Sequence, residues 1–126
     1  MRMEVLLAGA DLDALLSLVM ELGPASINPT IVESPHPVTA LISRPSEGSE
    51  VGIIALQGSE NVADLYELFD KHPRTRFVFL ARHFPPDAAL ARVAAKHGSQ
   101  FISRREPSVV IAATVIAMSV QAGMAS

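Results

Sequence analysis

Three arginines stand directly after apolar segments of the chain, and they are the charged side chains best placed for binding chemistry. Arg82 follows one such segment, and Arg104 and Arg105 follow the next. Guanidinium groups bind phosphate and carboxylate oxygens through paired hydrogen bonds. We therefore consider an anion or nucleotide site at these arginines, for a ligand such as a cyclic dinucleotide. The alternative is that Arg104 turns outward or pairs with a nearby acid such as Glu106.

The remaining side chains capable of chemistry lack the spacing that a catalytic or metal site needs. No two histidines lie one helical turn apart, as metal ligands on a helix do; they are His36, His72, His83 and His97. The chain has no cysteine, which excludes a thiol nucleophile and a cysteine-based zinc site. Gly58 and Ser59 lack the glycine spacing and the lysine of a phosphate-binding loop. We therefore expect no enzyme activity, no metal and no cofactor.

The composition is that of one globular domain. The chain has 126 residues, of which 49% are hydrophobic and 18% charged, and this excludes a disordered protein. A formal net charge of −3 gives no basic surplus for nucleic acid. The least polar segment, 109–118, is shorter than the roughly 20 residues that span a bilayer. We expect a single cytoplasmic domain over residues 1–126, without membrane contact.

Short apolar runs alternate with helical patterns along the whole chain. We expect strands at 3–8, 30–33, 51–56, 76–81 and 100–103, and helices at 12–22, 38–44, 62–71, 87–97 and 108–122. This alternation implies a parallel sheet covered on both faces. Right-handed crossovers favour the flavodoxin-like strand order 2-1-3-4-5, a doubly wound α/β fold. Ligands of such sheets bind at the carboxyl ends of the strands, where the three arginines fall.

The helix at 12–22 has a cap and an apolar stripe. Asp11 and Asp13 stand at its start, and Asp11 is better placed as the N-cap than as a metal ligand. The predicted core stripe consists of Leu12, Leu15, Leu16 and Val19. Leu18 and Leu22 lie off this stripe, so we expect them to add apolar surface outside the core.

Three segments resemble the receiver domains of bacterial response regulators, the CheY-like family, and the resemblance covers the whole chain. The run HPRTRFVFLARH at 72–83 resembles the fourth-strand region of NarL-type receivers, whose wording is close to HPxTRVLVLTAH. The run QFISRREP at 100–107 resembles the family's GYxxKxxxP at the fifth strand. The ending VQAGM at 120–124 is similar to the close of the last receiver helix, before a linker to a DNA-binding output domain.

The resemblance implies that the phosphorylation chemistry of the family is missing from this chain. The two acidic positions that hold Mg²⁺ in the family correspond to Gly9 and Ala10, and the phosphoacceptor aspartate corresponds to Ala55. The family's switch positions correspond to Ala81, Phe101 and Arg104. Phosphoryl transfer needs a carboxylate nucleophile and a metal ion that neutralises charge. Because Phe101 has no hydroxyl to hydrate, we expect its ring to lie inward.

The same resemblance sets the register of the last helix. Counted forward from Arg104, the family's core positions fall on Ile111, Val115 and Met118. The opposite face then holds Val109, Ala113, Ile116 and Val120. A count backward from Gly123 exchanges the two faces, and we prefer the forward count. An apolar face that the sheet leaves uncovered usually marks an interface, so we expect a homodimer through this helix with either the first helix or the fifth strand.

The function implied is that of a phosphorylation-independent pseudo-receiver of an atypical response regulator. It would act in signal transduction and transcription regulation through protein–protein interaction and dimerisation. Nucleic acid would be bound only by an output domain outside this chain, of the LuxR-like class. Three alternatives stay open: a small-ligand sensor that uses the vacated pocket, an adaptor for a kinase or motor-type protein, and a receiver-like localisation domain of a pilus-assembly ATPase.

Overall fold

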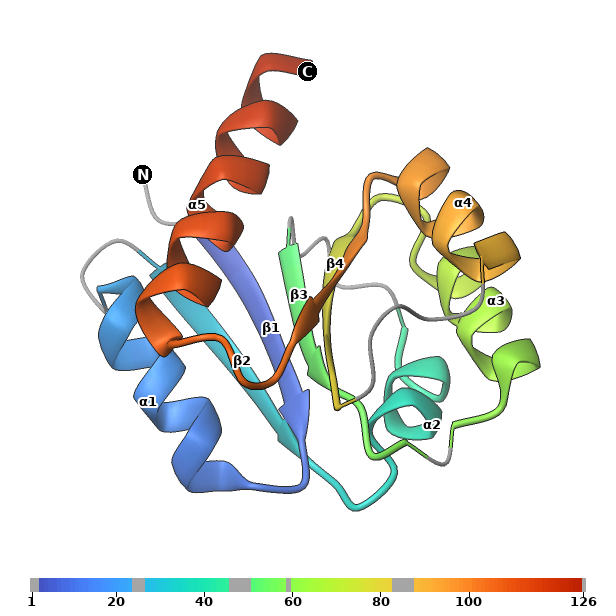
Figure 1. Cartoon of the computed structure of the whole chain (residues 1–126), viewed down its shortest axis with the longest axis horizontal. Helices are drawn as coiled ribbons and strands as arrows, with labels where there is room; N and C mark the ends of the chain where they lie inside the picture. The colour runs from blue at the N-terminus through green and yellow to red at the C-terminus, as the bar shows by residue number, and fades with distance from the viewer. Residues whose placement is uncertain (1–2, 24–26, 46–50, 59, 83–87, 126) are drawn as a thin grey trace.

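The computed structural model describes residues 3–23, 27–45, 51–58, 60–82 and 88–125. These residues form one parallel sheet in the order β2-β1-β3-β4-β5, the flavodoxin-like order predicted from the sequence (Figure 1). The strands are β1 (Met3–Gly9), β2 (Ile27–Glu33), β3 (Val51–Ala55), β4 (Arg76–Ala81) and β5 (Gln100–Ser103). The helices are α1 (Leu12–Leu22), α2 (Pro37–Ile42), α3 (Val62–Lys71), α4 (Ala88–His97) and α5 (Ser108–Ala125). Each helix follows the strand of the same number, so the fold is a doubly wound α/β domain.

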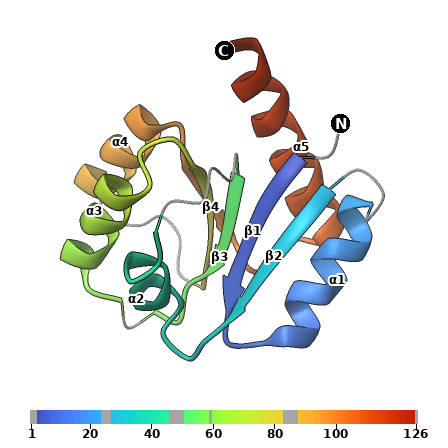
Figure 2. The same cartoon turned by 180° about the vertical axis from the view of Figure 1, so that it is seen from behind.

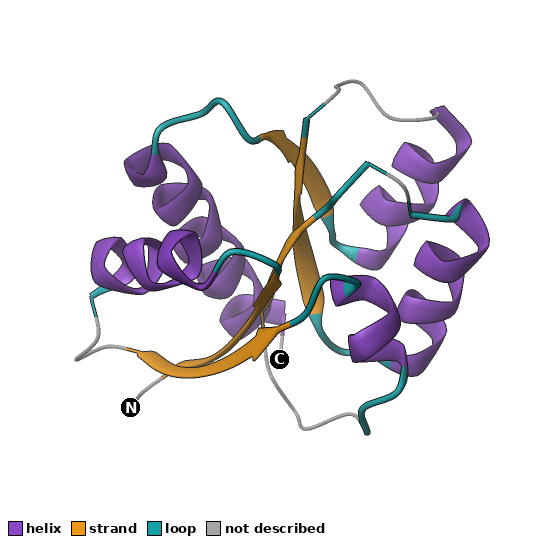
Figure 3. Cartoon of the chain, turned by 90° about the horizontal axis from the view of Figure 1, so that it is seen from below, coloured by secondary structure: helices purple, strands orange, loops and turns teal. Residues whose placement is uncertain are grey.

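Helices cover both faces of the sheet and divide the core into two layers. Helices α1 and α5 lie on one face, and α2, α3 and α4 lie on the other (Figures 2 and 3). Each layer has its own cluster of buried apolar side chains. Burial on both faces explains why β3 is apolar along its whole length. No helix in the described part of the chain is long and apolar enough to cross a membrane.

The register predicted for the last helix is confirmed. The side chains of the predicted core face of α5, Ile111, Val115 and Met118, are at most 5% exposed. The opposite face is open: Val109, Ile116 and Val120 are 61%, 47% and 56% exposed. The helix also continues beyond the predicted end, to Ala125.

The stripe predicted for α1 is wrong in part. Leu15 and Val19 are buried as expected, but the rest of the buried face consists of Leu18 and Leu22. The large apolar side chains of α1 that stay exposed are Leu12, Leu16 and Met20. The reason is that α5 packs beside α1, so the stripe that contains Leu18 and Leu22 joins the core shared with Ile111, Val115 and Met118. The sequence of α1 contains two overlapping apolar stripes. Its periodicity by itself therefore does not indicate which of the two is buried.

The edge strand β2 begins earlier than predicted, at Ile27 instead of residue 30. The added residues include Asn28 and Pro29, which look unlike a strand because both are depleted in sheets. They are tolerated because an edge strand is paired on one side only. The side-chain amide of Asn28 donates to both carboxylate oxygens of Glu4 on β1, at 2.9 and 3.1 Å.

The other predicted bounds differ by a few residues or match. The helices at 12–22 and 62–71 and the strands at 76–81 and 100–103 have the predicted ends. Helix α2 spans Pro37–Ile42, whereas residues 38–44 were predicted. It begins one residue early because Pro37 occupies its first turn, a favourable place for proline. The predicted start of the fourth helix at residue 87 falls outside the described residues.

The layer under α3 and α4 is built on phenylalanine rings. Phe77 and Phe79 on β4 are fully buried, and the ring of Phe69 on α3 lies 6.4 and 5.8 Å from their ring centres. Gly52 on β3 makes room for this packing, because a Cβ atom at that position would stand 2.8 Å from the ring of Phe77. A side chain larger than that of glycine at position 52 would therefore collide with the ring of Phe77.

Candidate functional site

The positions that correspond to the acidic pocket of the family come together at the carboxyl end of the sheet. Gly9 and Ala55 end the neighbouring strands β1 and β3, and a Cβ atom at Gly9 would stand 3.2 Å from that of Ala55. Ala55 and Ala81 are buried, whereas Ala10 is exposed at the start of the following loop. These four residues are one glycine and three alanines, so none of them has a side-chain oxygen.

A cavity of about 340 Å³ opens beside this corner, between the start of α1, the start of α5 and the ends of the central strands. Its apolar wall includes Ala55, Leu80 and Ile111. Its polar lining includes the guanidinium of Arg104 and the side chains of Asp11 and Glu106. The lining therefore combines one cation with two carboxylates, which weakens its attraction for an anion.

Arg104 has a main-chain partner. Its Nη1 donates a hydrogen bond to the carbonyl oxygen of Leu56, 3.1 Å away at the end of β3. The side chain of Arg104 therefore turns toward the end of β3. The carbonyl that Arg104 binds belongs to the residue directly after Ala55.

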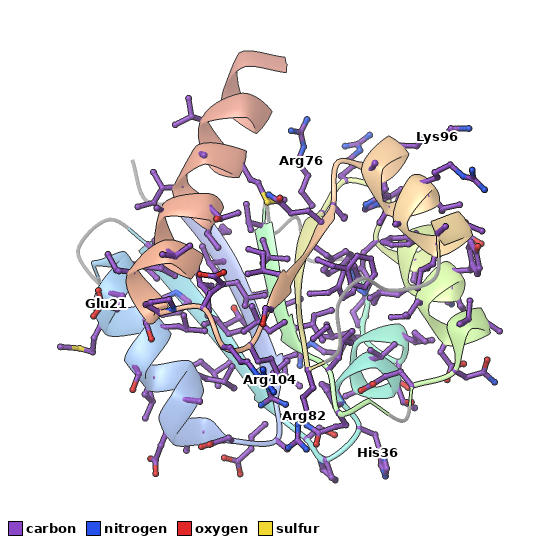
Figure 4. The ribbon with its side chains drawn as sticks, viewed as in Figure 1. Glu21, His36, Arg76, Arg82, Lys96 and Arg104 are labelled. Carbon is purple, nitrogen blue, oxygen red and sulfur yellow. The ribbon has the colours of Figure 1, made fainter. Side chains whose placement is uncertain are left out.

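The three arginines are at the same end of the sheet without sharing one pocket. Figure 4 shows Arg82 and Arg104 at the carboxyl ends of the strands. Arg82 and Arg105 are exposed, and the cavity lining, as far as the structure describes it, includes Arg104 and neither of the other two. An anion bound in the cavity would therefore meet one guanidinium instead of three.

One of the carboxylates that line the cavity, that of Asp11, caps a helix. The side chain of Asp11 accepts a hydrogen bond from the amide of Ala14 at 3.2 Å, which confirms the predicted N-cap of α1. Among the residues that the structure describes, no group of three or more histidine, aspartate or glutamate side chains is placed to hold a metal ion. The described residues at this end of the sheet thus present no carboxylate cluster of the kind that binds Mg²⁺.

Sequence reasoning missed Glu60. Its two carboxylate oxygens accept hydrogen bonds from the amides of Gln57, at 2.6 Å, and Gly58, at 2.8 Å. The next residue, Asn61, caps α3 by accepting from the amide of Ala63. The signal that could have found Glu60 is its position in a tight loop, directly before a helix cap, where free amides need an acceptor.

Phe101 lies inward, as its lack of a hydroxyl predicts. Its half-buried ring stacks on Phe79, with the ring centres 4.8 Å apart and an angle of 25° between the planes. The ring therefore belongs to the layer under α3 and α4. Its role as a switch position stays a prediction, as does that of Ala81.

The comparisons with known proteins give a fold and no close relative. No protein-family model and no curated protein sequence matches the chain. A CheY-like receiver domain protein from Methanospirillum hungatei matches with a TM-score of 0.75 at 11% identity, over 100% of both chains. An adenylate cyclase from Rhodopirellula baltica matches with a TM-score of 0.71 at 20% identity, over 99% of this chain and 93% of that one.

A third similar structure is a pilus assembly protein (cpaE) from Burkholderia thailandensis, with a TM-score of 0.67 at 13% identity, over 94% of this chain and 98% of that one. Response regulators recur among the other matches. At such identities the likeness concerns the arrangement of the backbone. The strand order, the five β-α units and these matches together show that the chain has the fold of CheY-like response-regulator receiver domains.

Proposed function

We propose that this domain is a phosphorylation-independent pseudo-receiver, which acts in signal transduction and transcription regulation through protein–protein contacts in the cytoplasm. The observation that carries the proposal is the buried methyl group of Ala55, packed beside Gly9 where the receiver family has its acidic pocket. An alanine side chain has no atom that can accept a phosphoryl group. We propose no catalytic activity, and the likeness to an adenylate cyclase extends to the fold alone.

We further propose that the domain forms a homodimer through the exposed apolar face of α5, which we define as Val109, Ala113, Ile116 and Val120. Val109, Ile116 and Val120 each leave about half or more of their surface open to water. Burying apolar surface contributes about 25 cal/mol per Å², so a few hundred Å² supplies several kcal/mol before the entropic cost of association. A second copy of the chain offers a surface of the same apolar character.

The test is the mass of the domain in solution. Light scattering should give twice the chain mass for the wild type and one chain mass for Ile116→Glu and for Val120→Glu, with unchanged circular dichroism. The control is Ala95→Glu, on the exposed side of α4 on the other face of the sheet, which should keep the dimer mass. A monomeric wild type, or dimeric Ile116→Glu and Val120→Glu, contradicts the proposed interface.

A small-ligand sensor is the second candidate, and the cavity of about 340 Å³ beside Arg104 favours it. A bound nucleotide or other anion should raise the melting temperature of the wild type and not that of Arg104→Ala. An equal shift in both proteins would exclude Arg104 as the binding residue.

A localisation domain of a pilus-assembly ATPase is the third candidate, favoured by the likeness to the pilus assembly protein. The sequence of the complete gene product separates the candidates. An ATPase domain supports the third, and a DNA-binding output domain supports the first.

A further inference from the structure

We propose that His97 is a pH-operated latch, which ties the end of α4 to the sheet through Ser99 while it is neutral and loosens this tie when it is protonated. The latch lies at the amino end of the strands, opposite to the site around Arg104. Figure 4 shows Arg76 and Lys96 at this end of the molecule and Arg104 at the other. The inference is independent of the proposed dimer and of the lost phosphorylation chemistry.

The hydrogen bonds of His97 fix which ring nitrogen carries the hydrogen. Nε2 lies 3.2 Å from the carbonyl oxygen of His72, at the end of α3. A carbonyl can only accept, so Nε2 is the donor and Nδ1 of the neutral ring has a free lone pair. Nδ1 lies 2.8 Å from the hydroxyl oxygen of Ser99, which donates its hydrogen to the ring.

The Ser99 hydroxyl connects the ring to the sheet. Its oxygen accepts a hydrogen bond from the amide of Phe77 on β4 at 2.9 Å, and the side chain is buried. Ser99 directly precedes β5, and its own amide donates to the carbonyl oxygen of Ala94 on α4. With neutral His97, every donor and acceptor of this chain of contacts is satisfied, and α4, β4 and the start of β5 are joined.

Protonation breaks this arrangement. A hydrogen on Nδ1 would point at the Ser99 oxygen, which already accepts from Phe77. The serine hydrogen would then lose its acceptor in a buried place, and a buried donor without a partner is unfavourable. The hydrogen bond between His97 and Ser99 is thus reversed, and the cost of the unpaired serine hydrogen weakens the tie between α4 and the sheet.

The surroundings of the ring oppose the positive charge. The ring centre of His97 lies 4.7 Å from that of Phe69 and 6.0 Å from that of Phe77, whose ring is nearly parallel to it. Burial lowers the pKa of His97 below its ordinary 6.5, and the charge of Arg76 on β4 lowers it further, against the opposite effect of the His72 carbonyl.

The other titratable groups nearby leave this balance in place. From α3 the facing residue is His72, whose own imidazole is turned to a different element, with Nε2 2.8 Å from the carbonyl oxygen of Leu41 on α2. From α4 itself Lys96 precedes His97 in the chain and adds a further cation. The groups with a stated effect on the pKa of the ring are thus the His72 carbonyl, which raises it, and Arg76, which lowers it.

The test is a titration of the wild-type domain by NMR, from pH 8 down to about pH 5, the range in which histidines titrate. The His97 ring should titrate with a midpoint below 6.5, and the amide signals of Phe77 and Ser99 should shift with the same midpoint. Amide exchange at the end of α4 should lose its protection over the same range, relative to α1. If the chemical shift of the Phe77 amide does not change as His97 titrates, the proposal is wrong.

Two variants complete the test. His97→Gln cannot titrate and should abolish the shift of the Phe77 amide. The matched control His36→Gln removes an exposed histidine that precedes α2 and should leave that shift unchanged. If the shift survives in His97→Gln, another group operates there and the latch is rejected. The wild-type titration decides the matter even if His97→Gln fails to fold.

Discussion

The carboxylate of Glu60 accepts a hydrogen bond of 2.6 Å from the main-chain amide of Gln57, and its second oxygen binds the amide of Gly58. The carbonyl of Leu56, one residue earlier, accepts a hydrogen bond from Arg104, which directly follows β5. The turn after β3 is therefore fastened by two side chains of opposite charge.

Removing the Glu60 carboxylate should destabilise the domain. Hydrogen bonds to a charged acceptor contribute about 1.5–3 kcal/mol, so Glu60→Ala should lower the free energy of unfolding by about that amount. Glu60→Gln keeps one acceptor oxygen and should cost less. The measurement is urea denaturation, with the exposed Glu67→Ala on α3 as control. A loss in Glu67→Ala as large as that in Glu60→Ala would show that the two amide contacts contribute nothing special.

The domain should be inert toward phosphoryl donors. Acetyl phosphate, or beryllofluoride with Mg²⁺, should neither add mass to the chain nor raise its melting temperature, because Ala55 offers no carboxylate. The receiver domain of NtrC, whose beryllofluoride-activated form has a similar fold, is the positive control. A stoichiometric aspartyl-phosphate in the mass spectrum of this chain would contradict the proposed function.

A methyl group at Gly52 should disturb the aromatic layer. The new Cβ atom would stand 2.8 Å from the ring of Phe77, which is fully buried and cannot swing into solvent. Overpacking of this kind costs about 1–3 kcal/mol, measured as the change in the free energy of unfolding of Gly52→Ala. The double variant with Phe77→Leu should lose less than the sum of the two single variants. Additive losses would show that the two positions do not clash.

Stability should fall on the acid side of neutrality because of His97. Its pKa in the folded state is below the ordinary 6.5 that it regains on unfolding, so the unfolded chain binds the proton first. The contribution of the neutral ring is complete above pH 6.5 and is lost as the pH falls from there through the lowered pKa. Urea denaturation at a series of pH values should show this decline, and His97→Gln should flatten it. An equal decline in the variant would assign the effect to other groups.

The sequence predicted the architecture because its signals are local. Short apolar runs, helix caps and the glycines and prolines between them indicate the order of the strands and helices. The forward count from Arg104 also placed Ile111, Val115 and Met118 correctly in the core. It failed at α1, where Leu18 and Leu22 are buried by packing against another helix. Local periodicity cannot contain that information.

The positions that form the site were predictable from the resemblance to receiver domains, but the contacts of their side chains were not. Gly9 and Ala55 meet as the alignment of positions implied, because strand order and register follow from the fold. The partner of Arg104 is a main-chain carbonyl 48 residues away, and His97 binds a carbonyl 25 residues away. No spacing rule links such pairs, because backbone carbonyls are the same in every residue.

Pro29 has a consequence for how copies of this chain can meet. It lies in β2, whose outer edge would otherwise be a template for a further strand from another molecule. A proline lacks the amide hydrogen that such a strand would need, and its ring obstructs the approach. The opposite edge, β5, is only four residues long. Both margins of the sheet therefore carry features that disfavour the addition of a further strand from another molecule.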